Sequence, residues 1–404
     1  MEREAAAAAG ARLAWPAPDE PAAAIDEVEH DLATLRALLA GDEARGRARY
    51  LLELNDALAR SLRTRWARWR GRFTPADGLV RVTDGTRETL AAARLGARAY
   101  SPSALQKFAA CPYQFFLSAI CRLEPRPEVT PVVELDPATR GHLFHRVQAD
   151  VMRALAAEGR LPLTAAARDA ARATLDLTLD RVADHYREEL APAIRRVWQD
   201  EVESMRADLR MWLEQTAATH AEWEPIAFEL AFGLRRDPEN DPRSVEAEVT
   251  LADGYRLRGI VDLVERRRRA ATDLRVTDYK TGRDYTRRNL VVGGGEMLQP
   301  VIYGVAIEQL FGARVVESRL YYCTRAGGFA ERIVPLSTEA KDRGAEVLAV
   351  VDRAIAAGFL PPAPRARACG ICDFHDVCGP QEEVRVKLKE QARLDELRTL
   401  REWP

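Results

Sequence analysis

Four short segments of the chain contain the residue types best suited to chemistry. They are Gly141–His145 (GHLFH), Gly259–Asp262 (GIVD), Asp278–Lys280 (DYK) and Gln299–Tyr303 (QPVIY). Between them these segments supply an imidazole, two carboxylates and an amine. Such a set can hold a hard divalent metal ion and activate a water molecule against a phosphodiester.

Asp262 and Asp278 are each flanked by apolar residues in segments that read as neighbouring strands. A carboxylate in an apolar strand is costly unless it is paired or binds a cation. Taken singly, either aspartate could cap a turn or pair with an arginine. Because GIVD precedes DYK and a Thr-Gly turn, we expect the two carboxylates to converge on Mg²⁺ or Mn²⁺.

Lys280 lies two residues after Asp278, so both side chains leave the same face of a strand. A compact ammonium can position one water molecule and stabilise charge in a transition state. We therefore expect Asp278 to bind metal and Lys280 to assist catalysis; a plain surface salt bridge is the alternative. Only five of the 60 basic residues are lysines: Lys107, Lys280, Lys341, Lys387 and Lys389.

Three further residues are candidates for the same site. His145 lies one helical turn after Gly141 and is expected to bind or orient the metal, although a lone histidine is often a satisfied core residue. Gln299 and Tyr303 are four residues apart and share one helix face, from which they could contact a nucleic-acid backbone or orient the lysine. Arginines after the second strand are expected to contact phosphates: Arg283, Arg287 and Arg288.

Four cysteines form a second constellation. Cys369, Cys372 and Cys378 follow a C-x2-C-x5-C spacing, and Cys111 lies far upstream. Structural disulfides are disfavoured in the cytoplasm, which is the compartment expected below. Four thiolates suit either zinc or an iron–sulfur cluster, and the spacing alone slightly favours zinc.

The order of elements predicts an α/β fold. Residues 1 to about 98 read as helical, and residues 138–222 as several amphipathic helices. The segments PIAFELAFGL, SVEAEVTL, YRLRGIVDLVERR and DLRVTDYK read as strands, with an Ala-Asp-Gly hairpin turn. A helix at 296–311, a strand (VVESRLYYCT) and a helix at 337–357 follow. This order indicates a mixed sheet flanked by helices, and the segment from about 381 reads as a charged helix.

Residues 63–72 carry arginines interleaved with Trp66 and Trp69. The expected arrangement is a solvated helix face with both tryptophans packed inward. The alternative is contact with nucleic-acid phosphates and bases, which this pairing of residue types also suits.

Composition limits the classes of function. The 404-residue chain has 47% hydrophobic residues and a net charge of −2, so any nucleic-acid surface must be a local patch. No apolar run approaches the roughly 18–20 residues of a membrane span, and the N-terminus lacks a signal-peptide core. We therefore expect a cytoplasmic protein. No lysine follows a glycine, so the chain has no phosphate-binding loop of an ATP-driven motor.

The motifs together resemble the RecB-type branch of the PD-(D/E)xK nuclease superfamily, in particular the C-terminal nuclease module of AddB-type helicase–nuclease subunits. The resemblance runs from about Ser101 to Gly379. It implies a restriction-endonuclease-like core with a helical insertion, in which metal is held by His145, Asp262 and Asp278. Catalysis in such a site also involves Lys280, Gln299 and Tyr303.

The resemblance further implies a [4Fe–4S] cluster held by Cys111, Cys369, Cys372 and Cys378. It divides the chain into a helical segment (1–98) that is the remnant or linker of a helicase-like region, a nuclease domain (99–380) and a charged C-terminal helix (381–404). The expected function is Mg²⁺- or Mn²⁺-dependent hydrolysis of DNA, as an exonuclease in recombinational repair, with an AddA- or RecB-like helicase partner. A non-catalytic DNA-binding or scaffold subunit with the same fold is the alternative, and a zinc-clipped nuclease is another.

Overall fold

The computed structural model describes residues 17–40, 52–53, 55–125, 131–219, 222–286, 289–378 and 381–404. The chain forms two compact units that alternate along the sequence. The first unit comprises Met1–Glu88, Ala110–Pro125 and Ala357–Glu396; the second comprises Thr89–Ala109, Arg126–Ala356 and Leu397–Pro404.

The second unit is built on a five-stranded mixed sheet with the order β1-β4-β5-β6-β7. Only β5 and β6 are parallel; the other neighbours are antiparallel. The strands are β1 (Trp223–Phe232), β4 (Gly259–Arg267), β5 (Ala270–Lys280), β6 (Arg314–Tyr322) and β7 (Glu331–Pro335). The α/β class predicted from the order of elements is confirmed.

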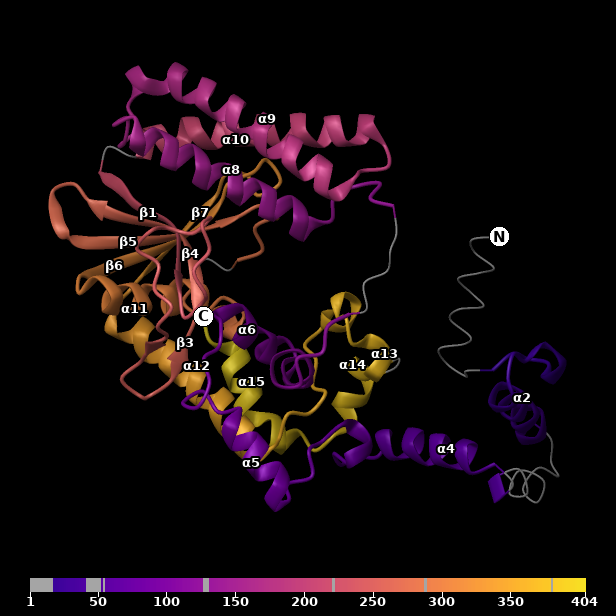
Figure 1. Ribbon diagram of the computed structural model, residues 1–404. Helices are drawn as coiled ribbons and strands as arrows, with labels where there is room; N and C mark the ends of the chain where they lie inside the picture. The colour runs from indigo at the N-terminus through magenta and orange to yellow at the C-terminus, as the bar shows by residue number, and fades with distance from the viewer. Residues whose placement is uncertain are drawn as a thin grey trace. The chain divides into compact units, whose positions relative to one another are not determined.

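Helices cover both faces of this sheet (Figure 1). One face carries α8 (Pro137–Ala157), α9 (Arg168–Leu190) and α10 (Arg195–Thr219), and the other carries α11 (Gln299–Phe311) and α12 (Thr338–Ala357). Two further helices, α6 (Pro102–Ala110) and α15 (Asp395–Glu402), and a hairpin of β2 (Val249–Thr250) and β3 (Arg256–Leu257) complete the unit. Among the described residues, no helix has both the length and the apolar character needed to cross a membrane.

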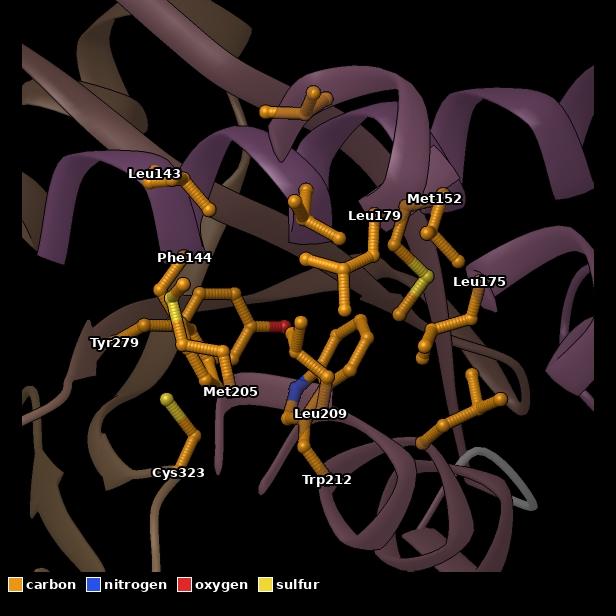
Figure 2. Close-up of a cluster of buried hydrophobic side chains, with 14 of the residues drawn as sticks. Leu143, Phe144, Met152, Leu175, Leu179, Met205, Leu209, Trp212, Tyr279 and Cys323 are labelled. Atoms are coloured by element: carbon orange, nitrogen blue, oxygen red, sulfur yellow. The ribbon is translucent and has the colours of Figure 1, made fainter. Parts of the chain in front are cut away.

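The main core lies between α8, α9, α10 and the sheet (Figure 2). Tyr279 of β5 points into this core, where its ring packs edge-on against Trp212 with 5.9 Å between centroids. Because side chains alternate along a strand, the inward direction of Tyr279 sends Asp278 and Lys280 to the opposite face. The core therefore fixes the orientation of the DYK motif.

The start of α8 is set by local chemistry. Asp136 accepts hydrogen bonds from the backbone nitrogens of Ala138 (2.9 Å) and Thr139 (3.0 Å), and Pro137 occupies the first helical position. The helix thus begins four residues before Gly141. The GHLFH motif lies in its second turn rather than at its start.

A network of charged side chains is buried on the face of the sheet to which Tyr279 also points. Glu265, which is fully buried, accepts two hydrogen bonds of 2.8 Å from Arg275 and one of 2.8 Å from Thr277. Arg319 lies 3.4 Å from the same carboxylate. These contacts connect β4 and β5, the strands that carry Asp262 and Asp278, with β6.

The first unit is helical. It contains α2 (Glu27–Leu39), α4 (Asp56–Arg68), α5 (Asp84–Ala92, which ends in the second unit), α7 (Pro112–Phe115), a π-helical turn (Phe116–Ile120), α13 (His375–Cys378) and α14 (Glu382–Arg385). Asn55 caps α4 by accepting a 2.9 Å hydrogen bond from the nitrogen of Leu58.

Several expectations from the sequence were wrong. The SVEAEVTL segment contributes only the two residues of β2, because Val245 bonds irregularly to the end of β1, and β7 was not predicted. The segment from 381 is not one charged helix: it contains α14, two 3-10 turns (Val386–Leu388, Gln391–Leu394) and α15. Burial of Lys389, which pairs with Asp77 at 2.7 Å, outweighs the helical pattern there.

Replacing Glu265 by glutamine should destabilise the second unit by about 3–5 kcal/mol, because the buried Arg275 and Arg319 lose their fully buried carboxylate partner and keep only the more exposed Glu317 and Glu331. The matched control is Glu224→Gln, which removes a half-exposed ion pair with Arg266 on the same sheet and should cost less than about 1 kcal/mol. Urea denaturation measures both. Equal losses for the two variants would contradict the structural role of the network.

Candidate active site

The candidate site lies where two strands separate. Pairing between β4 and β5 ends at Leu263 and Thr277, whereas β4 stays paired with β1 as far as Gly259. On the other side, β5 stays paired with β6 as far as Lys280. Asp262 and Asp278 are the first residues beyond the last β4–β5 pair. The separation leaves both carboxylates outside the ladder of backbone hydrogen bonds between β4 and β5.

Asp262 connects this opening to α8. Its Oδ2 atom accepts a 2.7 Å hydrogen bond from the backbone nitrogen of Tyr279 and lies 3.5 Å from Nδ1 of His145. Burial alone would lower the pKa of His145, but the charge and hydrogen bond of Asp262 raise that pKa to about 9. Burial alone would raise the pKa of Asp262, yet His145 lowers it. The pair is therefore an imidazolium and a carboxylate until a cation displaces the proton.

Glu229 is a third carboxylate at this point, and the sequence analysis missed it. Donor atoms of His145, Glu229 and Asp262 lie within 4.8 Å of one another. Burial and the negative charge of Asp262 raise the pKa of Glu229 to about 8. The signal was present in the sequence, because Glu229 is the only charged residue between Ile226 and Phe232 of a predicted strand.

The backbone of β1 is distorted where it presents Glu229. This residue has a φ of +53°, in the left-handed region that side chains other than glycine rarely adopt. Its carbonyl accepts a 3.0 Å hydrogen bond from Asp241, whose carboxylate in turn accepts a 2.9 Å bond from the nitrogen of Phe228. The buried Asp241 thus stabilises the strained backbone of Glu229 beside His145 and Asp262. Strained backbone of this kind is common at functional sites.

Asp278 and Lys280 form a second pair on the same strand face. The Nζ atom of Lys280 lies 2.6 Å from Oδ2 of Asp278 and donates a 2.9 Å hydrogen bond to Oε1 of Gln299. Burial alone would lower the pKa of Lys280, but the charge of Asp278 raises it. Burial, together with repulsion from Asp262, raises the pKa of Asp278 against the opposing effect of Lys280. Gln299 fixes the ammonium in place.

Tyr303 has a different environment from Gln299. Its side chain is buried, and its ring packs edge-on against Phe232 with 6.2 Å between centroids. A Cβ atom at Gly259 would lie 2.7 Å from this ring, so the glycine of GIVD allows α11 to approach β4. Contact of Tyr303 with a nucleic-acid backbone does not fit this burial; the residue instead anchors α11 behind Asp262.

Gly141 has the same role in α8 that Gly259 has in β4, because its missing side chain allows two elements to approach closely. A Cβ atom there would lie 3.3 Å from the hydroxyl of Thr281, the residue after Lys280. The absence of a side chain lets α8 approach the end of β5 closely enough to bring His145 to Asp262. Of the three arginines expected to contact phosphates, Arg283 is exposed, while Arg287 and Arg288 lie outside the described residues.

The donor set suits a hard divalent cation. His145, Glu229 and Asp262 converge in a partly buried pocket lined also by Gln148, Phe228 and Tyr279. Asp278 does not line this pocket, but it lies close enough for the charge of Asp262 to act on it. The mutual repulsion of the three carboxylates, visible in the raised pKa values of Glu229 and Asp278, is relieved by a bound positive charge. Oxygen ligands with one imidazole favour Mg²⁺ or Mn²⁺ over softer metals.

In the first unit, the four cysteines of the second constellation line one pocket. Cys111 precedes α7, and the other three come from the segment that contains α13. Burial raises the pKa of Cys111 to about 11 and that of Cys378 to about 12. Thiolates in this pocket therefore need a positively charged group to stabilise them.

Comparison with known proteins agrees with this architecture. The model of the PD-(D/E)XK nuclease superfamily matches residues 99–379. This chain belongs to the PD-(D/E)XK nuclease superfamily. The superfamily resemblance inferred from the motifs is thereby confirmed, and the relatives that follow confirm its AddB-like character.

Three curated relatives are AddB-type proteins, each named as a subunit of an ATP-dependent helicase/deoxyribonuclease. The chain is 29% identical over 236 residues to the protein of Symbiobacterium thermophilum, a match that covers 55% of this chain and 19% of the relative. It is 28% identical over 287 residues to that of Moorella thermoacetica (64% and 23%) and 23% identical over 257 residues to that of Carboxydothermus hydrogenoformans (62% and 22%). The chain thus spans about a fifth of the length of these relatives.

Glu229→Gln should weaken binding of Mn²⁺ about tenfold, because it replaces a charged oxygen ligand by a neutral one beside His145 and Asp262. The expected readouts are a weaker Mn²⁺ affinity in electron paramagnetic resonance titrations and a smaller rise in melting temperature at saturating Mn²⁺.

The control for this prediction is Asp253→Asn, which removes an exposed carboxylate in the β2–β3 turn and should leave the affinity unchanged. Unchanged Mn²⁺ binding in Glu229→Gln would exclude Glu229 from the ligand set.

Proposed function

We propose that this chain is a metal-dependent deoxyribonuclease that hydrolyses phosphodiester bonds of DNA. The observation that carries the proposal is the arrangement of Asp262 with His145 and of Asp278 with Lys280 on either side of the opening between β4 and β5. Membership of a nuclease superfamily and the names of the three relatives support it.

In this proposal, His145, Asp262 and Asp278 hold Mg²⁺ or Mn²⁺, and Glu229 adds a fourth donor. The cation would polarise the phosphate and make a water molecule a better nucleophile. Asp262 also keeps its position through the hydrogen bond from Tyr279, whose ring is fixed in the core. The ligands are therefore held by three strands of the sheet and by α8 rather than by loops.

Lys280 acts as a cation in this mechanism. Its pKa is raised, so the side chain remains an ammonium at neutral pH and does not serve as a general base. Gln299 and Asp278 together take up two of its three N–H groups and leave the third to bind the scissile phosphate or the attacking water. Lys280 thus stabilises negative charge that develops in the transition state. Tyr303 acts only indirectly, by placing α11 behind β4.

We also propose the biological setting from the relatives. Their names describe one subunit of an ATP-dependent helicase/deoxyribonuclease, so we propose a helicase partner, a role in recombinational repair and action as a cytoplasmic exonuclease. In this view residues 1–98 connect to a helicase-like region, residues 99–380 form the nuclease and residues 381–404 follow it. The non-catalytic alternative would require a broken metal set, and no member of the set is missing here.

We propose a [4Fe–4S] cluster as the group held by Cys111, Cys369, Cys372 and Cys378. All four cysteines line one pocket of the first unit. A C-x2-C-x5-C group with one distant cysteine is also the pattern that the family resemblance associates with such a cluster. Such a clip joins segments more than 250 residues apart in the chain and thereby reduces the entropy of the unfolded state.

Lys280→Ala should lower the rate of cleavage at least about a hundredfold, because charge stabilisation at the scissile phosphate is lost. The assay is digestion of end-labelled single- and double-stranded DNA with Mg²⁺ or Mn²⁺. Lys341→Ala is the matched control, since that lysine pairs with Glu308 away from the site. Equal activity of Lys280→Ala and wild type, or an inactive wild type with bound metal, would refute the proposed mechanism.

Cys378→Ser should yield protein without iron or acid-labile sulfide and with increased sensitivity to protease, because the clip between distant segments is lost. The readouts are metal analysis and visible absorbance after anaerobic purification. Cys121→Ser, which changes an exposed cysteine of the same unit, should retain the cluster. Stoichiometric zinc in the wild type, with no iron, would contradict the iron–sulfur assignment.

A further inference from the structure

The segment Arg63–Arg72 at the end of α4 has a composition that the nuclease chemistry does not use. It contains five arginines and two tryptophans and no carboxylate. We had expected the tryptophans to pack inward, but Trp66 is 65% exposed and Trp69 is 44% exposed. Two large aromatic side chains in solvent on one helix end are unusual and require an explanation.

The exposed rings are associated with guanidinium groups of the same unit. Arg70 lies over the ring of Trp66 at 3.9 Å from its centroid, and Arg385 lies 6.0 Å from the centroid of Trp69. The guanidinium of Arg70 covers one face of Trp66 and restrains the ring, while most of the side chain stays accessible. A restrained indole beside a cation is well suited to stacking against a nucleobase.

Three arginines of the segment lack a carboxylate partner within the part of the chain that the structure describes. They are Arg63, Arg65 and Arg72. Burial, together with the nearby charges of Arg68 and Arg385, lowers the pKa of Arg65. Crowding of like charges around two aromatic rings creates a local field that favours an anion, although the chain as a whole is nearly neutral.

The surface is also rigidly supported. Arg68 donates hydrogen bonds to the carbonyls of Ala76 (2.7 Å) and Cys378 (2.6 Å), so it braces the end of α4 against the cysteine-bearing segment. Arg385 donates a further 2.8 Å bond to the same Cys378 carbonyl. The guanidinium groups of Arg68 and Arg385 are therefore engaged in structural hydrogen bonds. The exposed Arg63, Arg65 and Arg72 remain accessible to a ligand.

A protein partner is the competing occupant. Ile371 is 84% exposed and Val377, Val384 and Leu388 of the same unit are about half exposed, but exposed aliphatic side chains are by themselves normal on protein surfaces. A protein covering Arg63, Arg65 and Arg72 would have to provide a matching set of carboxylates. A nucleic-acid strand provides regularly spaced phosphates together with bases that stack on the rings. The observations therefore favour nucleic acid.

We propose that Arg63–Arg72 is a binding surface for single-stranded DNA. Bases stack on Trp66 and Trp69, and phosphates pair with Arg63, Arg65 and Arg72. A single strand is specified because stacking on an indole requires a base that is not already stacked within a duplex. This surface retains DNA without cutting it, so it goes beyond the proposed function and does not depend on the metal site.

The test measures binding of fluorescein-labelled single-stranded and double-stranded oligonucleotides by anisotropy, in EDTA and with the Lys280→Ala protein, so that no cleavage occurs. Trp66→Ala should weaken single-strand binding about tenfold, and Trp66→Phe should restore most of it. Arg63→Gln with Arg65→Gln should reduce the salt dependence of the binding constant by about 0.7 for each phosphate that is no longer neutralised.

The controls are Leu177→Ala and Arg172→Gln, which remove an exposed apolar side chain and an exposed arginine from α9 of the other unit. Neither should change affinity more than about twofold, the level of surface substitutions outside an interface. Circular dichroism verifies that the variants are folded. Single-strand affinity unchanged by Trp66→Ala, or an equal loss in the control variants, would overturn the proposal. The proposal would also be overturned if Trp66→Ala abolished binding of a protein that copurifies with the wild type and left DNA binding intact. That result would assign the surface to a protein partner.

Discussion

The mutual repulsion of three carboxylates is the constraint around which the second unit is organised. Glu229, Asp262 and Asp278 come from three neighbouring strands. Asp262 lies in one group of donor atoms with Glu229 and His145, and its charge also acts on Asp278 where β4 and β5 separate. His145 offsets part of this charge from α8, and Lys280 offsets part of it along β5. With two protein cations beside three carboxylates, the pKa of Glu229 is raised to about 8 and this residue keeps a proton at neutral pH. A bound divalent ion would replace that proton.

The residues around these carboxylates hold the chemical groups in position. The strained backbone at Glu229 is held by Asp241, and Tyr279 is locked into the helical core, which fixes the direction of Asp278 and Lys280. Gly141 and Gly259 lack side chains where α8 and α11 approach the strands. The residues that carry no chemistry thus determine whether the chemical groups meet, which is why the motifs combine glycines with ionisable residues.

The sequence predicted those parts of the molecule in which local pattern and tertiary packing agree. The amphipathic helices at 138–222 were recognised because their periodicity matches their buried faces, and the α/β class followed from the order of elements. The strand containing Asp278 was also recognised, although β5 is buried on both faces from Leu274 to Tyr279. Glu229 was missed since its importance depends on a kink in β1 that is fixed by a residue twelve positions later.

The continuous helix expected after 381 was wrong because Lys389 is drawn into a buried pair with Asp77, a contact invisible to local pattern. The outward direction of Trp66 was equally unpredictable, since a helix with both basic and aromatic residues has no unambiguous buried face.

The central claim is that one divalent ion binds between Asp262 and Asp278. Anomalous diffraction from crystals of the protein grown with Mn²⁺ tests this most directly. The account predicts a single strong manganese peak in the opening between β4 and β5, within coordination distance of His145, Asp262 and Asp278. No peak there at saturating Mn²⁺, in crystals whose site side chains are well ordered, would contradict it.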